Sequence, residues 1–153
     1  MSQLVKPSAD AVENMLEMLF GNGTAVSSVD ASSVAAVAAA RYVDDDGSLA
    51  ALCACDAPFL AYSGAALSMM PKGGAEDMIA DGDFSKTIME KFYEVMNICS
   101  RLIMSDSSLH IRLDNTIQGD AVAAERSGLS PSQSIAFKVS IPKYGDGQFV
   151  FEF

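Results

Sequence analysis

Polar side chains recur at helical spacing in the middle of the chain, at Glu90, Glu94, Asn97 and Arg101. On a helix, which turns ~100° per residue, they fall within an arc of roughly 60° and therefore share one face. Carboxylate, carboxamide and guanidinium groups held on a rigid helix can position water and bind a charged partner. An ordinary solvated helix also has a polar face, and that simpler interpretation stays open. Asn97 favours a functional role, because asparagine in mid-helix lowers helix propensity without forming an ion pair.

Other familiar catalytic signatures are missing from the sequence. It contains no phosphate-binding glycine loop, dinucleotide fingerprint, zinc-binding histidine pair or nucleophile elbow. His110 is the single histidine, and a lone histidine on a strand is more often structural than catalytic. Cys53, Cys55 and Cys99 are most simply buried thiols. We therefore expect no metal site and no cofactor of the protein's own.

The polar side chains lie in the segment with the strongest apolar periodicity. Asp83 is a suitable N-cap, and the pattern predicts one helix over residues 83–104, about six turns long. The apolar stripe opposite the polar face comprises Phe84, Ile88, Phe92, Val95, Cys99, Leu102 and Ile103.

Two further helices are predicted nearer the N-terminus. The first covers residues 8–20, where Asp10 and Glu13 have the spacing of a capping box. The second begins at Asp56, has Pro58 in its first turn and ends before residues 71–74, where Pro71 and two glycines break the pattern.

The rest of the chain favours antiparallel strands. An Asp-Gly turn at 44–47 predicts a hairpin of residues 32–43 and 48–55, and alternating apolar residues predict strands from Leu109 to Asp114, over 135–141 and over 148–153. Residues 118–133 are expected to be mostly a connection. Together these elements predict one α+β domain, residues 1–153, with two layers: an antiparallel sheet, the long helix and two further helices. We expect the short, aromatic terminal strand at a sheet edge, which makes a homodimer one expectation.

Composition excludes several classes of protein. Half of the 153 residues are hydrophobic and 20% are charged, a balance that excludes intrinsic disorder. Ten basic residues against 20 acidic ones give a net charge of −10, so we expect no nucleic-acid partner and no membrane partner. The start of the chain lacks the pattern of a secretory signal, which predicts a cytoplasmic protein.

Glu94-Val95-Met96-Asn97 resembles the Glu-x-x-Asn motif of the CheX/CheC/FliY group of chemotaxis phosphatases. The resemblance covers most of the chain: a first helix, a hairpin, a second helix, the motif helix and terminal strands. Only one copy of the motif is present, since the residues three positions after Glu13 and Glu17 are Leu16 and Phe20. The closer likeness is therefore to CheX, and it implies a CheC-like fold.

The resemblance also implies an activity, hydrolysis of the aspartyl-phosphate on a CheY-like response-regulator receiver domain. The residue matching Asn97 would orient the attacking water, and the residue matching Glu94 would pair with a receiver lysine. Glu90 and Arg101, on the same predicted face, become candidate partner-binding residues, and two roles stay open for Arg101: pairing with Glu94 or contacting an acidic receiver. The Mg²⁺ that the resemblance implies belongs to the receiver, so this chain supplies no metal ligand.

The sequence departs from the family pattern at residues 98–102, where the family favours small residues and glycine. Three hypotheses stay open: a receiver phosphatase, a non-catalytic receiver-binding adaptor, and a structural or oligomeric domain with a solvated helix face. Exposure separates them in part. If Glu94 and Asn97 lie buried against the protein's own sheet, docking on a receiver is excluded.

Overall fold

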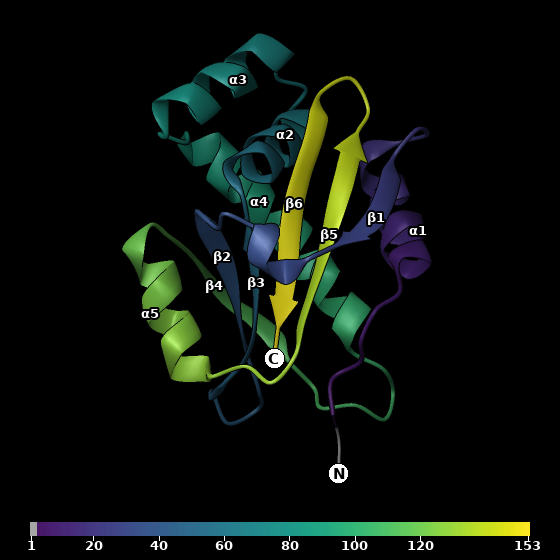
Figure 1. Ribbon diagram of the computed structural model, residues 1–153, viewed down its shortest axis with the longest axis vertical. Coiled ribbons are helices and arrows are strands. Elements are labelled where there is room, and N and C mark those ends of the chain that lie inside the picture. The colour runs from purple at the N-terminus through teal and green to yellow at the C-terminus, as the bar shows by residue number, and fades with distance from the viewer. Residues whose placement is uncertain (1–2) are drawn as a thin grey trace.

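The computed structural model describes residues 3–153 and contains one six-stranded antiparallel sheet. The order of strands across the sheet is β1-β5-β6-β3-β2-β4 (Figure 1). The strands are β1 (Ala25–Val29), β2 (Ala38–Val43), β3 (Leu49–Cys55), β4 (Arg112–Gln118), β5 (Ser134–Ile141) and β6 (Gly145–Glu152). The helices are α1 (Ala9–Phe20), α2 (Ala57–Ser68), α3 (Lys72–Asp81), α4 (Lys86–Cys99) and α5 (Asp120–Leu129), with short 3₁₀ turns η1 (Ala31–Ser33) and η2 (Ser100–Ile103).

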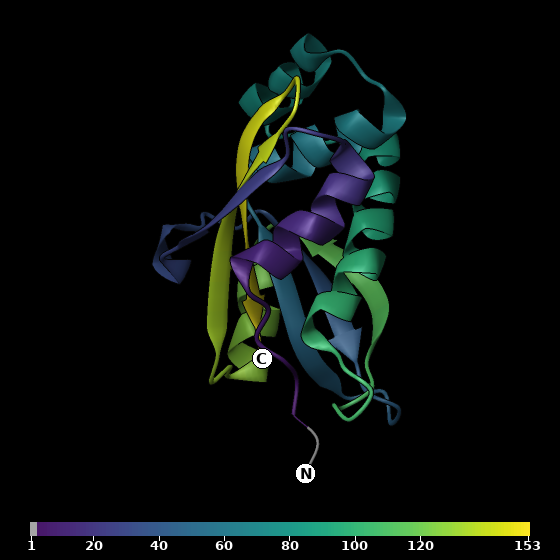
Figure 2. The same cartoon turned by 90° about the vertical axis from the view of Figure 1, so that its right-hand side faces the viewer.

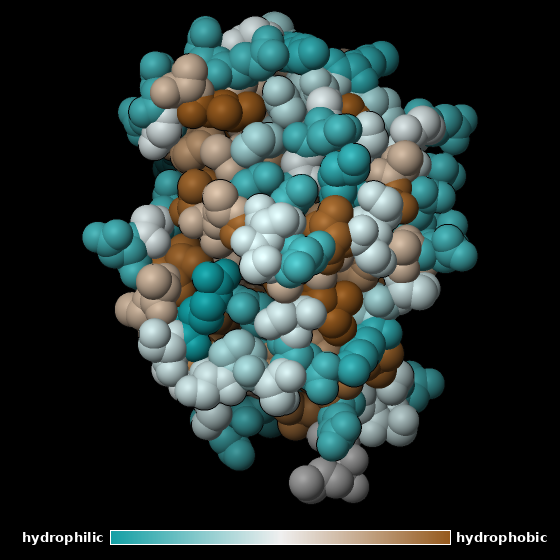
Figure 3. All heavy atoms as spheres, viewed as in Figure 1, coloured by the Kyte–Doolittle hydropathy of each residue, from teal (hydrophilic) through white to brown (hydrophobic). Residues whose placement is uncertain are grey.

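Helices α1, α2 and α4 cover one face of the sheet, and α5 lies on the other (Figures 1 and 2). The main core lies between the sheet and helices α1, α2 and α4. Its largest fully buried side chains include Tyr42, Phe59, Phe92, Phe137 and Phe149. On the outer face, Val122 of α5 packs in a smaller cluster with residues such as Ala39, Ala54 and Val150. On that face, apolar side chains reach the surface as small patches among polar ones (Figure 3).

Burial on both faces explains why an alanine-rich segment forms a strand rather than a helix. Ala38 and Ala40 of β2 face the main core, whereas Ala39 faces the outer cluster, and all three are fully buried. Cys53 and Ala54 of the neighbouring strand β3 alternate in the same way. Small side chains let helices pack closely on both faces, so tertiary contacts outweigh helix propensity here.

The predicted α+β class is confirmed, as are the first two helices and the β2–β3 hairpin. Two local details were wrong. The N-cap of α1 is Ser8, whose Oγ accepts a hydrogen bond from the Ala11 amide. Glu13 does not close a capping box; its Oε1 accepts a hydrogen bond of 2.9 Å from the Val26 amide and so joins α1 to β1.

Two helices, α3 and α5, were not predicted. Each buries only one side chain, Ala75 in α3 and Val122 in α5, so neither has an apolar stripe in the sequence. Neither has a side-chain N-cap. Residues 72–74, expected to interrupt the helical pattern, form the first turn of α3. Helix α5 lies in residues 118–133, which were expected to be mostly a connection.

The terminal strand is not at an edge of the sheet. β6 lies between β5 and β3, and the edge strands are β1 and β4. Phe149 and Phe151 of β6 are fully buried and pack edge to face, which accounts for the aromatic character of this strand. The homodimer expectation therefore loses the argument on which it rested. None of the helices in residues 3–153 is both long and apolar enough to span a bilayer.

Candidate functional site

Helix α4 carries the predicted motif and is held to the sheet along one side. Its N-cap is Ser85, whose Oγ accepts a hydrogen bond from the Ile88 amide at 3.3 Å; Asp83 lies outside the helix. The side chains that α4 buries are Ile88, Phe92, Val95, Met96 and Cys99. The predicted apolar stripe is thus confirmed over this length, and the opposite face is left to solvent. α4 runs along one border of the molecule (Figure 2).

The C-terminal turn of α4 is fastened by two hydroxyl groups. The Tyr42 hydroxyl of β2 donates a hydrogen bond of 2.6 Å to the Met96 carbonyl, and the Ser100 hydroxyl donates one of 2.7 Å to the Asn97 carbonyl. Burial raises the pKa of Tyr42 well above its ordinary value, so this phenol stays neutral and donates. The α-helix ends at Cys99, and the predicted continuation to Met104 was wrong, because η2 follows with 3₁₀ geometry.

Glu94 and Asn97 are exposed together on the free face of α4. Their spacing of three residues separates them by ~4.5 Å along the helix axis. Glu90 lies one turn earlier, and its side chain is 62% exposed, against 57% for Glu94. The structure therefore brings three of the four predicted residues to one face. Arg101 is also exposed, but it lies in η2, so the α-helical arc no longer sets its direction.

Each glutamate has a lysine of the same helix nearby. Lys91 Nζ lies 3.5 Å from Glu94 Oε2, and Lys86 Nζ lies 4.0 Å from Glu90 Oε1. Lys91 was not among the predicted residues, although its spacing to Glu94 could have indicated the pair. Within residues 3–153, the ion-pair partner of Glu94 is Lys91 and not Arg101. Exposed pairs of this kind are weak, so a partner's lysine can displace Lys91.

A shallow hollow of about 480 Å³ lies beside Glu94, between α4 and the edge strand β4. Tyr93 contributes its ring, which is 40% exposed, and Met89 and Thr116 complete the apolar part of the wall. Sequence reasoning missed Tyr93 and Thr116. The signal for Tyr93 was an aromatic residue outside the apolar stripe, whereas Thr116 could be placed only by the pairing of β4 with β2.

Most of the side chains that depart from the family pattern after Asn97 point inward. Cys99, Ser100 and Leu102 are buried and Ile98 is half-buried, so their bulk is accommodated by the protein's own core. Arg101 is the exception among these five residues. A partner approaching Asn97 would therefore meet only one bulky side chain that the family pattern does not anticipate.

The remaining reactive groups do not lie on the exposed face of α4. The three cysteines are buried, and burial raises the pKa of the Cys99 thiol to about 12. His110 is exposed beside the β2–β3 turn, with Nδ1 2.9 Å from Asp45 Oδ1. Within residues 3–153, no three His, Cys, Asp or Glu side chains are arranged to hold a metal ion.

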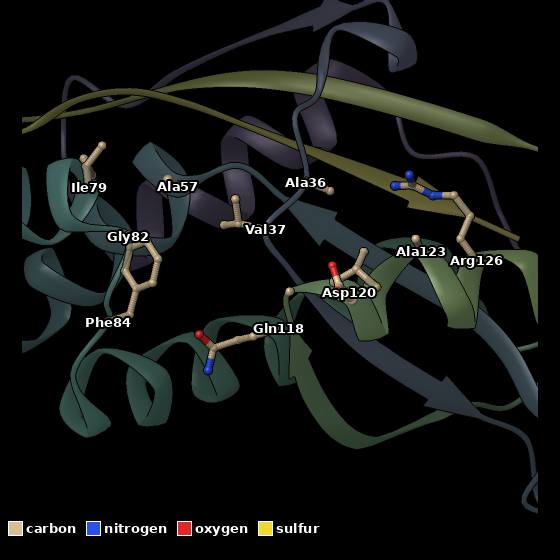
Figure 4. Close-up of a pocket in the computed structure, with 12 residues that line it drawn as sticks. Ala36, Val37, Ala57, Ile79, Gly82, Phe84, Gln118, Asp120, Ala123 and Arg126 are labelled. Atoms are coloured by element: carbon tan, nitrogen blue, oxygen red, sulfur yellow. The ribbon is translucent and has the colours of Figure 1, made fainter.

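A larger hollow, about 740 Å³, lies elsewhere, where α5 approaches the loop before α4 (Figure 4). Most of its wall is apolar, including Val37, Ile79 and Phe84. Its one basic side chain, Arg126, is already bonded to Glu152 through Nε at 2.6 Å. The hollow thus presents no pair of free groups with evident chemistry.

Comparisons with known proteins establish the fold. No protein-family model and no curated protein matches the sequence. Among solved structures, the FliM middle domain from Vibrio alginolyticus matches with a TM-score of 0.53 and 11% identity, over 95% of this chain and 87% of that one. The FliM middle domain from H. pylori matches with a TM-score of 0.49 and 8% identity, over 95% and 84%. The match to the Vibrio alginolyticus domain shows that this chain has the fold of the FliM middle domain, and the predicted fold class is confirmed.

Proposed function

We propose that this protein is a CheX-like phosphatase that hydrolyses the aspartyl-phosphate of a CheY-like receiver domain. Asn97 positions the attacking water, and Glu94 exchanges Lys91 for a lysine of the receiver. Glu90 and Arg101 contact the receiver at the two ends of this face. The observation that carries the proposal is the joint exposure of Glu94 and Asn97 on one turn of a helix whose other face is buried.

The reaction needs few catalytic groups from the enzyme, because an acyl phosphate is already activated. The water oxygen attacks phosphorus opposite the aspartyl oxygen, the P–O bond to the aspartate breaks, and the products are inorganic phosphate and a free carboxylate. Asn97 accepts a hydrogen bond from the water through its carboxamide oxygen and so holds it in line. Receiver-bound Mg²⁺ would neutralise phosphate charge, and this chain supplies no ligand to it. This role needs neither a nucleophile nor a cofactor of the protein's own.

The test is the decay of a phosphorylated CheY-like receiver with and without the protein. We expect faster decay with the wild type, and a loss of about ten-fold or more in kcat/KM for Asn97→Ala. Glu94→Gln should raise KM more than it lowers kcat, because it weakens docking. Thr87→Ala, an exposed change at the start of the same helix, is the matched control and should leave the rate unchanged. If Asn97→Ala retains full activity, Asn97 does not position the water.

A non-catalytic adaptor is the second candidate, and the exposure of Arg101 is the observation that favours it. A bulky cation one turn beyond Asn97 can hold a receiver by its acidic surface while keeping the phosphoryl group away from the carboxamide. An adaptor would bind the phosphorylated receiver without changing its lifetime. In that case Arg101→Ala should weaken binding or reveal phosphatase activity.

A further inference from the structure

A third hollow, of about 610 Å³, lies far along the chain from the motif, where the ends of α1 and α2 meet the β5–β6 turn at the top of Figure 1. Phe20, Ala66, Met69, Met70 and Tyr144 provide much of its wall. We call this hollow the methionine groove. The proposed phosphatase activity uses none of these side chains.

Met69 has an unusual conformation for its residue type. It is the C-cap of α2 in the left-handed region, with φ 59° and ψ 32°, where glycine is the usual residue. Its side chain is 88% exposed, so no internal packing explains a methionine at this position. An exposed, flexible thioether at a strained position is typical of a surface that receives apolar groups from a partner.

The wall of the methionine groove is preformed. The Tyr144 hydroxyl lies within hydrogen-bond distance of two carbonyls at the end of α2, those of Ala65 at 3.3 Å and Met70 at 2.5 Å. This contact joins the β5–β6 turn to α2. Binding there would require little ordering of the backbone, so a small contact can give measurable affinity.

The charge of the methionine groove is opposite to that of the whole protein. The chain carries 20 acidic and ten basic residues, yet the charged residues that line this groove are Lys72 and Lys143. Both are exposed, and within residues 3–153 neither forms an ion pair. Glu76, one turn beyond Lys72, lies near Tyr62 and does not line the groove. Two free ammonium groups beside apolar walls fit a ligand that is both apolar and acidic.

We propose that the methionine groove docks an acidic segment of a partner protein, with an apolar side chain seated against Met69 and Tyr144 and carboxylates beside Lys72 and Lys143. Attraction between opposite charges then acts at this surface, within a protein whose net charge otherwise repels acidic partners. The segment is recognised by this pairing of an apolar residue with flanking acids.

The probe is an acetylated, amidated peptide, Asp-Glu-Leu-Phe-Glu-Asp, titrated into isotopically labelled full-length protein and followed by NMR. We expect saturable shifts of the amides around Met69 and Lys143, and weaker binding as salt rises. The combined variant Lys72→Gln with Lys143→Asn should bind about five-fold more weakly. Asparagine tolerates the left-handed conformation that Lys143 adopts at φ 73°. Lys138→Asn on β5 removes one positive charge outside the groove, half of the change in the combined variant, and should bind as the wild type does.

Met69→Gly separates binding from structure. Glycine relieves the left-handed strain, so this variant should unfold at no lower urea concentration than the wild type and yet bind the peptide several-fold more weakly. The proposal is overturned if the acidic peptide gives no saturable shift at millimolar concentration, or if Lys-Lys-Leu-Phe-Lys-Lys binds equally well. It is also overturned if the lysine and Met69 variants abolish a dimer of this chain while peptide binding is absent.

Discussion

The hydroxyl of Tyr42 is expected to support the candidate site from behind, and Tyr42→Phe tests this. The variant keeps the buried ring, so no cavity forms, and it removes the hydroxyl that donates to the Met96 carbonyl. That carbonyl also accepts a hydrogen bond from the Ser100 amide, so it does not become an orphan. The cost should therefore be that of one ordinary buried hydrogen bond, about 1 kcal/mol, or about 2–4 °C in Tm for a chain of this size.

The effect on the site should exceed the effect on overall stability. Without Tyr42 Oη, the last turn of α4 is held by fewer contacts. The rate of amide hydrogen exchange at Asn97 to Ser100 should therefore rise more than the rate for amides that exchange only through global unfolding. Receiver dephosphorylation should also slow. Tyr144→Phe is the matched control, because it removes a hydroxyl that bonds α2 rather than α4. It should lower stability similarly without slowing dephosphorylation. Equal exchange and equal rates in the two variants would refute the reasoning.

Four further predictions concern the rest of the molecule. Ser85→Ala should cost about 1 kcal/mol in urea unfolding because it removes the N-cap of α4, whereas Asp83→Ala should be neutral; the reverse ranking would contradict the assigned cap. Gly147→Ala should cost more than about 2 kcal/mol, since its Cβ would lie 2.5 Å from the Phe59 backbone. Burial raises the pKa of Cys99 to about 12, so thiols ionise first in the unfolded chain and the free energy of unfolding should fall as pH rises above about 8.5; Cys99→Ala should flatten this slope. Encounter with an acidic receiver should quicken as salt screens the net charge of −10, and stopped-flow rates that fall steeply with salt would contradict this.

Elements that carry their own pattern were predictable, and elements that depend on distant contacts were not. α4 was recognisable because five of its side chains face one core. By contrast, α5 is held to the sheet by ion pairs, Arg41 Nε to Glu125 Oε1 at 3.0 Å and Arg126 Nε to Glu152 Oε1 at 2.6 Å. Such pairs join residues 26 or more positions apart, and they leave no periodicity in the sequence.

The position of the terminal strand shows the same limit. Alternation of apolar residues predicts that a strand exists and which face is buried, but it carries no information on its neighbours. β6 lies between β5 and β3, and the chain must cross the sheet from β4, at one edge, to β5 before the β5–β6 hairpin returns. Phe149 and Phe151 were therefore placed on a strand, while their full burial and the central place of that strand in the sheet were not predicted. In the candidate site, Thr116 was missed for the related reason that only the packed structure shows what lies beside Glu94.

The way α4 is held separates its stability from its proposed activity. The contacts that fasten it, from Tyr42, Ser85 and Ser100, involve its buried face, its ends and its backbone carbonyls. The side chains of Glu94 and Asn97 take no part in them, and the one ion pair of Glu94 is exposed and weak. A helix fastened in this way has no structural need for asparagine at position 97, where alanine would form a better helix. An unfavourable residue on a turn that Tyr42 and Ser100 fasten therefore supports the proposed positioning role of Asn97 over a merely solvated face.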